Sequence, residues 1–190
     1  MADLDRRAVM KALLAERGEL LVVPGLGSAT WDAAAADGSP RNFYLWGAMG
    51  GAAMIGLGLA LAQPGRPVAV ITGDGEQLMG LGALATIGVR RPRNLCVIVL
   101  DNRHFGETGM QQSHTGLGTD LCAVARACSF DWVAEAGDMA GVADIRRRLH
   151  AMAGCGFARV PIEAVDRDRV LPEHDGVKIK DSFRAAIGVA

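Results

Sequence analysis

The chain has 190 residues, of which 50% are hydrophobic and 22% charged, a composition typical of a globular protein with one core. Its 20 Lys and Arg residues against 21 Asp and Glu residues leave a formal net charge of −1, so charge does not favour nucleic acid or an acidic membrane as a partner. The longest apolar run, residues 50–62, is too short to cross a bilayer. Four cysteines without a CxxC pair, and no secretory segment, predict reduced cysteines in a cytoplasmic protein.

Segments with helical and strand-like patterns alternate along the chain. We expect helices at 4–17 with Asp3 as cap, 28–36 with Ser28 as cap, 50–62, 77–88, 120–128 and 139–153, and strands at 20–23, 67–72, 94–100 and 158–165. The strands are apolar on both faces, as a parallel sheet covered on both sides requires. The prediction is a single three-layer α/β/α domain over residues 1–190, with a mainly parallel sheet and a charged C-terminal tail at 166–190.

Polar residues follow two of the expected strands. Gly73-Asp74-Gly75-Glu76 comes after the strand at 67–72, and Asp101-Asn102 after the strand at 94–100. Only one helix, one connection and one strand separate them, so both strand ends should be neighbours at the carboxyl edge of the sheet. Carboxylate and amide oxygens suit Mg²⁺ or Ca²⁺ shared with phosphates, and the amides of a Gly-rich helix start can face a phosphate. The pattern predicts a site for a diphosphate bridged by a divalent cation.

This stretch resembles the cofactor signature of the thiamine diphosphate enzymes, which begins with Gly-Asp-Gly and closes roughly 30 residues later at an Asn pair or Asp-Asn. A second similarity is Phe-Tyr-Leu-Trp-Gly-Ala-Met-Gly at 43–50, before a Gly- and Ala-rich helix. Taken together, residues 42–58, the Gly-Asp-Gly region and residues 101–111 are most similar to the branch of sulfopyruvate decarboxylase β subunits and phosphonopyruvate decarboxylases. The resemblance covers about residues 20–165 and implies the thiamine diphosphate-binding fold, of the diphosphate-binding (PP) type.

The resemblance also implies a role for each matching residue. The backbone carbonyl of Gly47 would bind the aminopyrimidine, and Met49 would bend the cofactor. Asp74 and Asn102 would be metal ligands through their side chains, and His104 through its backbone carbonyl. Glu76 departs from the family pattern; since a carboxylate beside a diphosphate is repulsive, we expect its side chain to turn outward and only its amide to contact the ligand. The implied cofactor-binding set is Gly47, Met49, Gly73, Asp74, Gly75, Glu76, Asn102, His104, Phe105 and Gly106.

The implied activity is a decarboxylation that needs thiamine diphosphate, Mg²⁺ and a second subunit. The substrate would be a small anionic 2-oxo acid, sulfopyruvate or phosphonopyruvate, converted to an aldehyde and CO₂. Glu107 and Thr108 are the catalytic candidates on the substrate side, and Arg103 or the partner would hold the anionic tail. In this family the activating Glu belongs to a pyrimidine-binding domain, for which this chain has no room. We therefore expect a hetero-oligomer with a pyrimidine-binding subunit of similar size, and an inert chain in isolation.

Several alternatives stay open from the residues alone. The same cofactor site would serve a carboligase or a 2-oxo acid oxidising subunit, and the chain could instead be a non-catalytic assembly subunit. An NAD-binding module is disfavoured, because residues 25–27, Gly-Leu-Gly, lack the third glycine of the dinucleotide fingerprint. Asp74 could merely cap a helix, Met49 could be a core residue, and Glu107 could be a surface charge. His114 is interpreted as a solvated loop residue.

Overall fold

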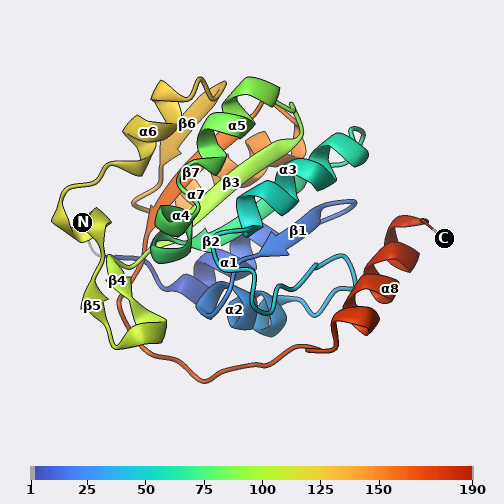
Figure 1. Cartoon of the computed structure of the whole chain (residues 1–190), viewed down its shortest axis with the longest axis horizontal. Helices are drawn as coiled ribbons and strands as arrows, with labels where there is room; N and C mark the ends of the chain where they lie inside the picture. The colour runs from blue at the N-terminus through green and yellow to red at the C-terminus, as the bar shows by residue number, and fades with distance from the viewer. Residues whose placement is uncertain (1–2, 190) are drawn as a thin grey trace.

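The computed structural model describes residues 3–189, and its centre is a five-stranded parallel sheet (Figure 1). The strands follow the order β1 (Leu21–Pro24), β2 (Val68–Gly73), β3 (Leu95–Asp101), β7 (Gly156–Pro161) and β6 (Trp132–Glu135). All four neighbouring pairs are parallel. A small antiparallel pair, β4 (His104–Phe105) and β5 (Gln111–Gln112), follows β3.

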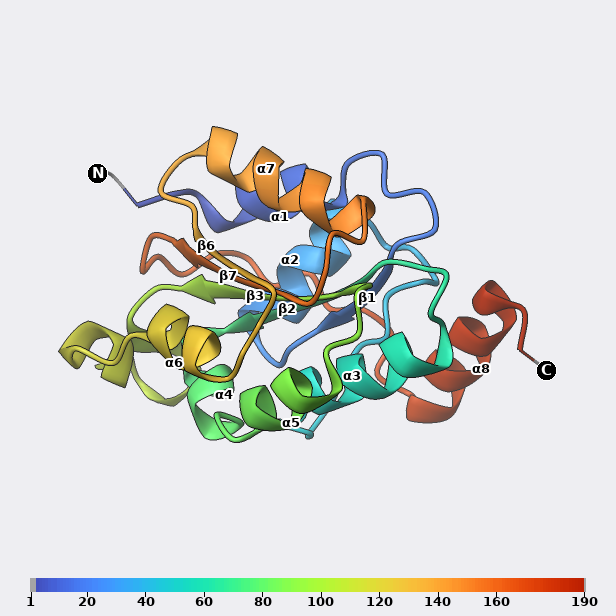
Figure 2. The ribbon, with the colours of Figure 1, turned by 90° about the horizontal axis from the view of Figure 1, so that it is seen from above.

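Helices cover both faces of this sheet (Figure 2). One face carries α1 (Arg6–Leu14), α2 (Ser28–Ala36) and α7 (Met139–His150), and the other carries α3 (Ala52–Ala62), α4 (Asp74–Met79), α5 (Ala83–Arg90) and α6 (Leu121–Ala127). Side chains of β2 alternate between two cores, with Val68 and Val70 in the one beneath α3 and Ala69 and Ile71 in the one beneath α1. The expected three-layer α/β/α fold with a parallel sheet is confirmed.

The crossover between β2 and β3 brings the two polar strand ends together, as expected. Gly73 is paired in register with Leu100, so Asp74 and Asp101 leave the sheet at the same edge. A second connection reaches this edge from the N-terminal segment, where Leu4 forms a parallel bridge with Ile162. The Leu4 amide donates to the Pro161 carbonyl at 3.2 Å, and the Leu4 carbonyl accepts from the Glu163 amide at 3.0 Å. The start of α1 is therefore held at the carboxyl edge of the sheet.

Several helix boundaries differ from the expectation by one to three residues, and three of the differences have a clear physical cause. Asp5, and not Asp3, caps α1, because its carboxylate accepts hydrogen bonds from the amides of Arg7 and Ala8. The N-cap of α2 is Gly27 in place of Ser28, at a φ of +72° that favours glycine. The helix expected at 77–88 is divided into α4 and α5 around Gly80, where an added Cβ would lie 2.2 Å from the Gly50 carbonyl oxygen.

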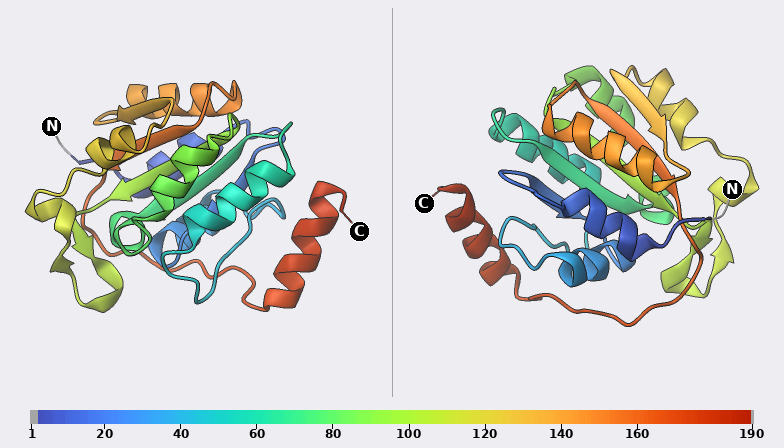
Figure 3. Two further views of the ribbon diagram at one scale, coloured as in Figure 1. Left: turned by 45° about the horizontal axis from the view of Figure 1, so that its top comes forward. Right: turned by 180° about the vertical axis from the view of Figure 1, so that it is seen from behind.

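The short strands β4 and β5, strand β6 and a helix in the C-terminal tail were not predicted from the sequence. Strand β6 is only four residues long and only partly buried at the edge of the sheet. The charged tail does not stay irregular, because residues 176–187 form α8 (Gly176–Ile187), seen beside the sheet in Figure 3. Phe183 of α8 packs edge-on against Phe43, with ring centroids 5.2 Å apart. None of the helices within residues 3–189 is both long and apolar enough to span a membrane.

Candidate functional site

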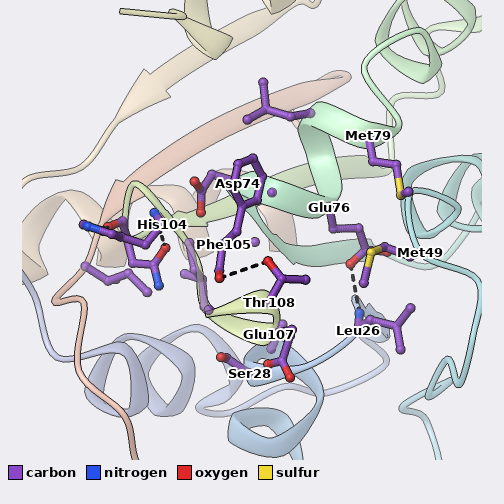
Figure 4. A pocket seen from close by; sticks show the side chains of 18 of the residues that line it. Leu26, Ser28, Met49, Asp74, Glu76, Met79, His104, Phe105, Glu107 and Thr108 are labelled. Carbon is purple, nitrogen blue, oxygen red and sulfur yellow. Dashed lines mark hydrogen bonds between the residues drawn. The ribbon is translucent and has the colours of Figure 1, made fainter. Parts of the chain in front are cut away.

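A cavity of about 590 Å³ opens at the carboxyl edge of the sheet (Figure 4). It lies between the start of α2, the start of α4 and the segment after β3. Eleven of the twelve residues assigned from the sequence line this cavity; they are Met49, Gly73, Asp74, Gly75, Glu76, Asn102, His104, Phe105, Gly106, Glu107 and Thr108. Gly47 is the exception and stands outside the lining, in a left-handed conformation with a φ of +105°. The residues predicted from separate motifs therefore lie together in one pocket.

Asp74 is the buried carboxylate of this pocket, with 2% of its surface exposed. No side chain caps α4; the Asp74 carboxylate instead accepts a hydrogen bond from the Ser113 hydroxyl, and the Thr115 hydroxyl lies 3.2 Å from the same oxygen. The cap interpretation of Asp74 is therefore wrong. Burial raises the pKa of the Asp74 carboxyl, the nearby Asp101 charge adds to the rise, and the two hydroxyls oppose it. A cation beside Asp74 would favour the ionised form.

The two other candidate metal ligands form a tight turn. The Asn102 side-chain oxygen accepts from the His104 amide at 2.9 Å, and the His104 Nδ1 lies 2.8 Å from the Asn102 carbonyl oxygen. Within residues 3–189 no group of three His, Cys, Asp or Glu side chains could hold a metal ion. The donors available are one carboxylate, one amide and backbone carbonyls, which suits Mg²⁺ when phosphate and water complete the coordination. The residues present thus fit a magnesium diphosphate and do not form an all-protein metal cage.

The orientation of Glu76 corrects the sequence-based expectation. Its side chain does not turn outward; it is 8% exposed and points toward the loop after β1 (Figure 4). The carboxylate accepts from the Leu26 amide at 2.9 Å and from the Thr72 hydroxyl at 2.8 Å. Burial raises its pKa, while these hydrogen bonds oppose the rise. An added Cβ at Gly25 would lie 1.9 Å from the Glu76 carboxylate, so the missing side chain at Gly25 makes this orientation possible.

The loop between β1 and α2 is a wall of the pocket that sequence reasoning did not assign. Leu26, Ser28 and Ala29 line the cavity. The first turn of α2, whose amides have no helical partners, therefore faces the cavity, as anion-binding helix starts do. Gly27 lies so close to Glu107 that an added Cβ would be 2.5 Å from its carboxylate oxygen. The sequence signal for this wall is the pair of glycines, Gly25 and Gly27, that follows a strand.

Ser113 and Thr115 connect the pocket to a second buried carboxylate. Thr115 donates to Asp101 at 2.8 Å, and Arg159 donates to the other oxygen of Asp101 at 2.6 Å. Asp101 and Ser113 are both fully buried. The segment after β3, which the sequence predicts to be a loop, is thus anchored by its own hydroxyls between the two aspartates. His114, interpreted as solvated, is exposed and also lines the cavity, where it packs edge-on against Phe105 with ring centroids 5.8 Å apart.

The far end of the cavity is apolar and open. Met49 and Met79 lie there, opposite Asp74 and His104 (Figure 4), and their side chains are 47% and 67% exposed. Leu26, Leu78 and Leu81 also line the cavity. Met49 is therefore not a core methionine. The pocket combines a polar end that fits a metal and a diphosphate with an apolar end that fits aromatic rings.

Residues 25–158 match the family model of the C-terminal TPP-binding domain of thiamine pyrophosphate enzymes. The chain belongs to this family. It is 36% identical to sulfopyruvate decarboxylase subunit beta of Methanothermobacter thermautotrophicus, over 95% of this chain and 94% of that protein. It is 37% identical to phosphonopyruvate decarboxylase of Streptomyces hygroscopicus, over 88% of this chain but only 43% of that protein. The sequence resemblance is confirmed, and the chain is a thiamine diphosphate-binding protein.

A solved structure supports the fold. A Mycobacterium smegmatis chain described as a thiamin diphosphate-dependent enzyme superposes with a TM-score of 0.69 at 20% identity, over 86% of this chain and 32% of that one. This protein thus corresponds to one part of larger family members, as it does for the Streptomyces relative.

Proposed function

We propose that this chain is the thiamine diphosphate-binding subunit of a hetero-oligomeric 2-oxo acid decarboxylase acting on sulfopyruvate or phosphonopyruvate. The match along nearly the whole length of a sulfopyruvate decarboxylase beta subunit carries the proposal. When bound, thiamine diphosphate supplies the carbon nucleophile and the electron sink that loss of CO₂ requires. The products are an aldehyde and CO₂.

Within this proposal each end of the cavity has its own task. Asp74 and Asn102 hold Mg²⁺ through their side chains and His104 through its backbone carbonyl. Gly73, Gly75, Glu76, Phe105 and Gly106 contact the cofactor, and Met49 supports its rings. The Gly47 carbonyl binds the aminopyrimidine, a role supported by the family pattern alone because Gly47 lies outside the cavity lining.

Glu107 and Thr108 are the proposed catalytic pair on the substrate side. Both are exposed at the rim of the cavity, where they can meet a substrate that arrives from outside. The Thr108 hydroxyl donates to the Gln111 side chain at 3.1 Å, which orients it. Arg103, one candidate for the anionic tail, pairs with Asp3 and is absent from the cavity lining in residues 3–189. The tail contact is therefore assigned to another residue or to the partner.

A pyrimidine-binding subunit of similar size is the proposed partner. Large apolar side chains are exposed around the open end of the cavity and along α3, namely Trp46, Met49, Met54, Leu61 and Met79. Helix α3 has apolar residues all round, which is typical of a helix covered on both sides. Three similar proteins are described as subunit beta of sulfopyruvate decarboxylase, which supports a second subunit. A cytoplasmic location is part of the proposal, supported by four free cysteines.

Co-expression tests the proposal. The chain is produced with the neighbouring gene product of similar size, and CO₂ release is measured with sulfopyruvate, phosphonopyruvate and pyruvate. We expect release that needs both chains, Mg²⁺ and thiamine diphosphate, and that disappears in Asp74→Ala. Cofactor binding without release from any of the three acids would contradict the decarboxylase assignment and favour ligation, oxidation or an assembly role.

A further inference from the structure

Arg6 is a buried arginine in the wall of the cavity that no motif marked. It is 5% exposed and belongs to the first turn of α1. Its Nε lies 2.9 Å from an oxygen of Asp32, a fully buried residue of α2. Arg6 is the one lysine or arginine that lines the cavity among residues 3–189. Its guanidinium group therefore carries the one lysine or arginine charge in the wall of the cavity within the described residues.

The hydrogen-bonding capacity of Arg6 is not satisfied by the chain. The Nε atom faces Asp32 as an ion pair, but the buried Nη2 atom has no hydrogen-bond partner within residues 3–189. A buried donor left without an acceptor costs free energy, so Nη2 in the cavity wall indicates an acceptor that binds there. Arg7 makes the contrast clear, because it donates to the other oxygen of Asp32 at 3.0 Å and is absent from the cavity lining.

The net charge around Arg6 indicates that this acceptor is an anion. Asp32 is paired with two arginines, the buried Arg6 and the partly exposed Arg7, so this cluster carries an excess of one positive charge. A fixed guanidinium with free donors matches the oxygens of a phosphate, to which it can bond through more than one N–H. The cluster thus favours an anion in the adjoining cavity.

Two anions could accept from Arg6, namely the diphosphate of the cofactor and the reacting 2-oxo acid, and the position of Arg6 favours the diphosphate. Leu4, two residues earlier, is bridged to Ile162, whose amide donates to the Asp101 carbonyl next to Asn102. Arg6 is thereby attached to the end of the cavity that holds the candidate metal ligands. A diphosphate must reach those ligands, whereas the reacting acid must reach the rings of the cofactor at the apolar end.

We propose that Arg6 binds the diphosphate of thiamine diphosphate, as a cationic contact additional to the metal ion. The inference rests on the proposed function, which supplies the occupant. Asp32 is then a positioning residue that fixes the guanidinium. Arg7 balances the second oxygen of Asp32 without touching the ligand.

Calorimetric titration of the assembled complex with thiamine diphosphate and Mg²⁺ tests this assignment. We expect Arg6→Gln to weaken cofactor binding by about tenfold to 100-fold, the range for a lost charge-assisted hydrogen bond. Arg6→Lys, which keeps the charge, should recover part of the affinity. Binding of thiamine, which lacks the diphosphate, should not change between Arg6→Gln and the wild type.

Arg7→Gln is the matched control, since it removes one charge from the same carboxylate outside the cavity. We expect its affinity for thiamine diphosphate to stay within about twofold of the wild type. Equal losses in the two Gln variants, or an unchanged affinity in Arg6→Gln, would overturn the inference. An unchanged cofactor affinity with a raised KM for the anionic acid would assign Arg6 to the substrate instead. A wild-type complex that binds no thiamine diphosphate would remove the proposed function itself.

Discussion

Asp74, the first residue of α4, accepts a buried hydrogen bond from Ser113, which lies 39 residues later in the chain. This bond attaches the segment after β3 to the carboxylate proposed to bind Mg²⁺. The Ser113 hydroxyl also lies 2.9 Å from the Thr115 hydroxyl, which bonds to Asp101. The position of this segment and the orientation of the proposed metal ligand Asp74 are therefore coupled through the hydroxyls of Ser113 and Thr115.

Ser113→Ala removes this attachment. We expect the free energy of unfolding to fall by about 1–3 kcal/mol, because a carboxylate loses a buried donor. Affinity for Mg²⁺ and thiamine diphosphate should also fall, because the segment carries Asn102 and His104 near its start. Urea denaturation and cofactor titration measure the two effects. Ser182→Ala, at an exposed position on α8, is the control and should leave both quantities unchanged.

Asp74→Asn should separate stability from binding. Because burial raises the pKa of Asp74 in the folded chain, the folded state favours the protonated form more than the unfolded state does. Without metal, the carboxylate therefore costs stability as the pH rises above about 4, with the full cost present above the folded pKa. We expect the metal-free Asn variant to melt at a higher temperature than the wild type at pH 7, by a margin that narrows toward acidic pH.

The same variant should lose Mg²⁺-dependent binding of thiamine diphosphate. Asp101→Asn provides the contrast, since Asp101 is held by Arg159 and its neutralisation leaves that guanidinium with a weaker partner. We expect Asp101→Asn to lower the melting temperature at pH 7. Melting curves recorded in EDTA from pH 5 to 8 measure the melting temperatures of the two variants and of the wild type. A metal-free Asp74→Asn chain that melts below the wild type at pH 7 would contradict this account.

Gly25→Ala should damage the pocket through Glu76. The new Cβ would lie 1.9 Å from the Glu76 carboxylate and 2.6 Å from the Thr72 hydroxyl, so the bond to the Leu26 amide must break. We expect a loss of about 1–3 kcal/mol in unfolding free energy and weaker cofactor binding. Gly65→Ala, with nothing within 4 Å of the added atom, should be neutral in both assays. Similar behaviour of the two variants would show that Gly25 is not needed for steric reasons.

Met54→Asp should weaken assembly with the second subunit. Met54 is an exposed methionine of α3 outside the cavity lining, so a charge there alters the proposed interface without touching the pocket. We expect the dissociation constant of the complex to rise by about tenfold or more, measured by sedimentation velocity. Val89→Asp, on the exposed side of α5, is the control. Unimpaired assembly of Met54→Asp would remove α3 from the interface.

The sequence was sufficient for the parts of the fold that depend on local pattern. Apolar strands predicted the parallel sheet, and the distance between the Gly73 and Asn102 motifs predicted their common edge. Arg6 and Ser113 were not predicted, because Arg6 reaches the cavity wall from the first helix, Ser113 acts through a hydrogen bond to Asp74 across 39 residues, and no local pattern marks either contact. The predicted orientation of the Glu76 side chain was wrong, because the prediction considered repulsion from a ligand but not the Leu26 amide and Thr72 hydroxyl that hold the carboxylate.

The parallel bridge between Leu4 and Ile162 determines where a tag can be attached to this protein. Residues 3–6 run from that bridge directly into the pocket wall at Arg6, so the leading segment forms part of the wall of the cavity. Affinity tags or fusions placed ahead of Asp3 would act on the pocket across a few residues. The exposed end of α8 offers a better attachment point, because α8 packs beside Phe43 and contributes no residue to the cavity lining within the described chain.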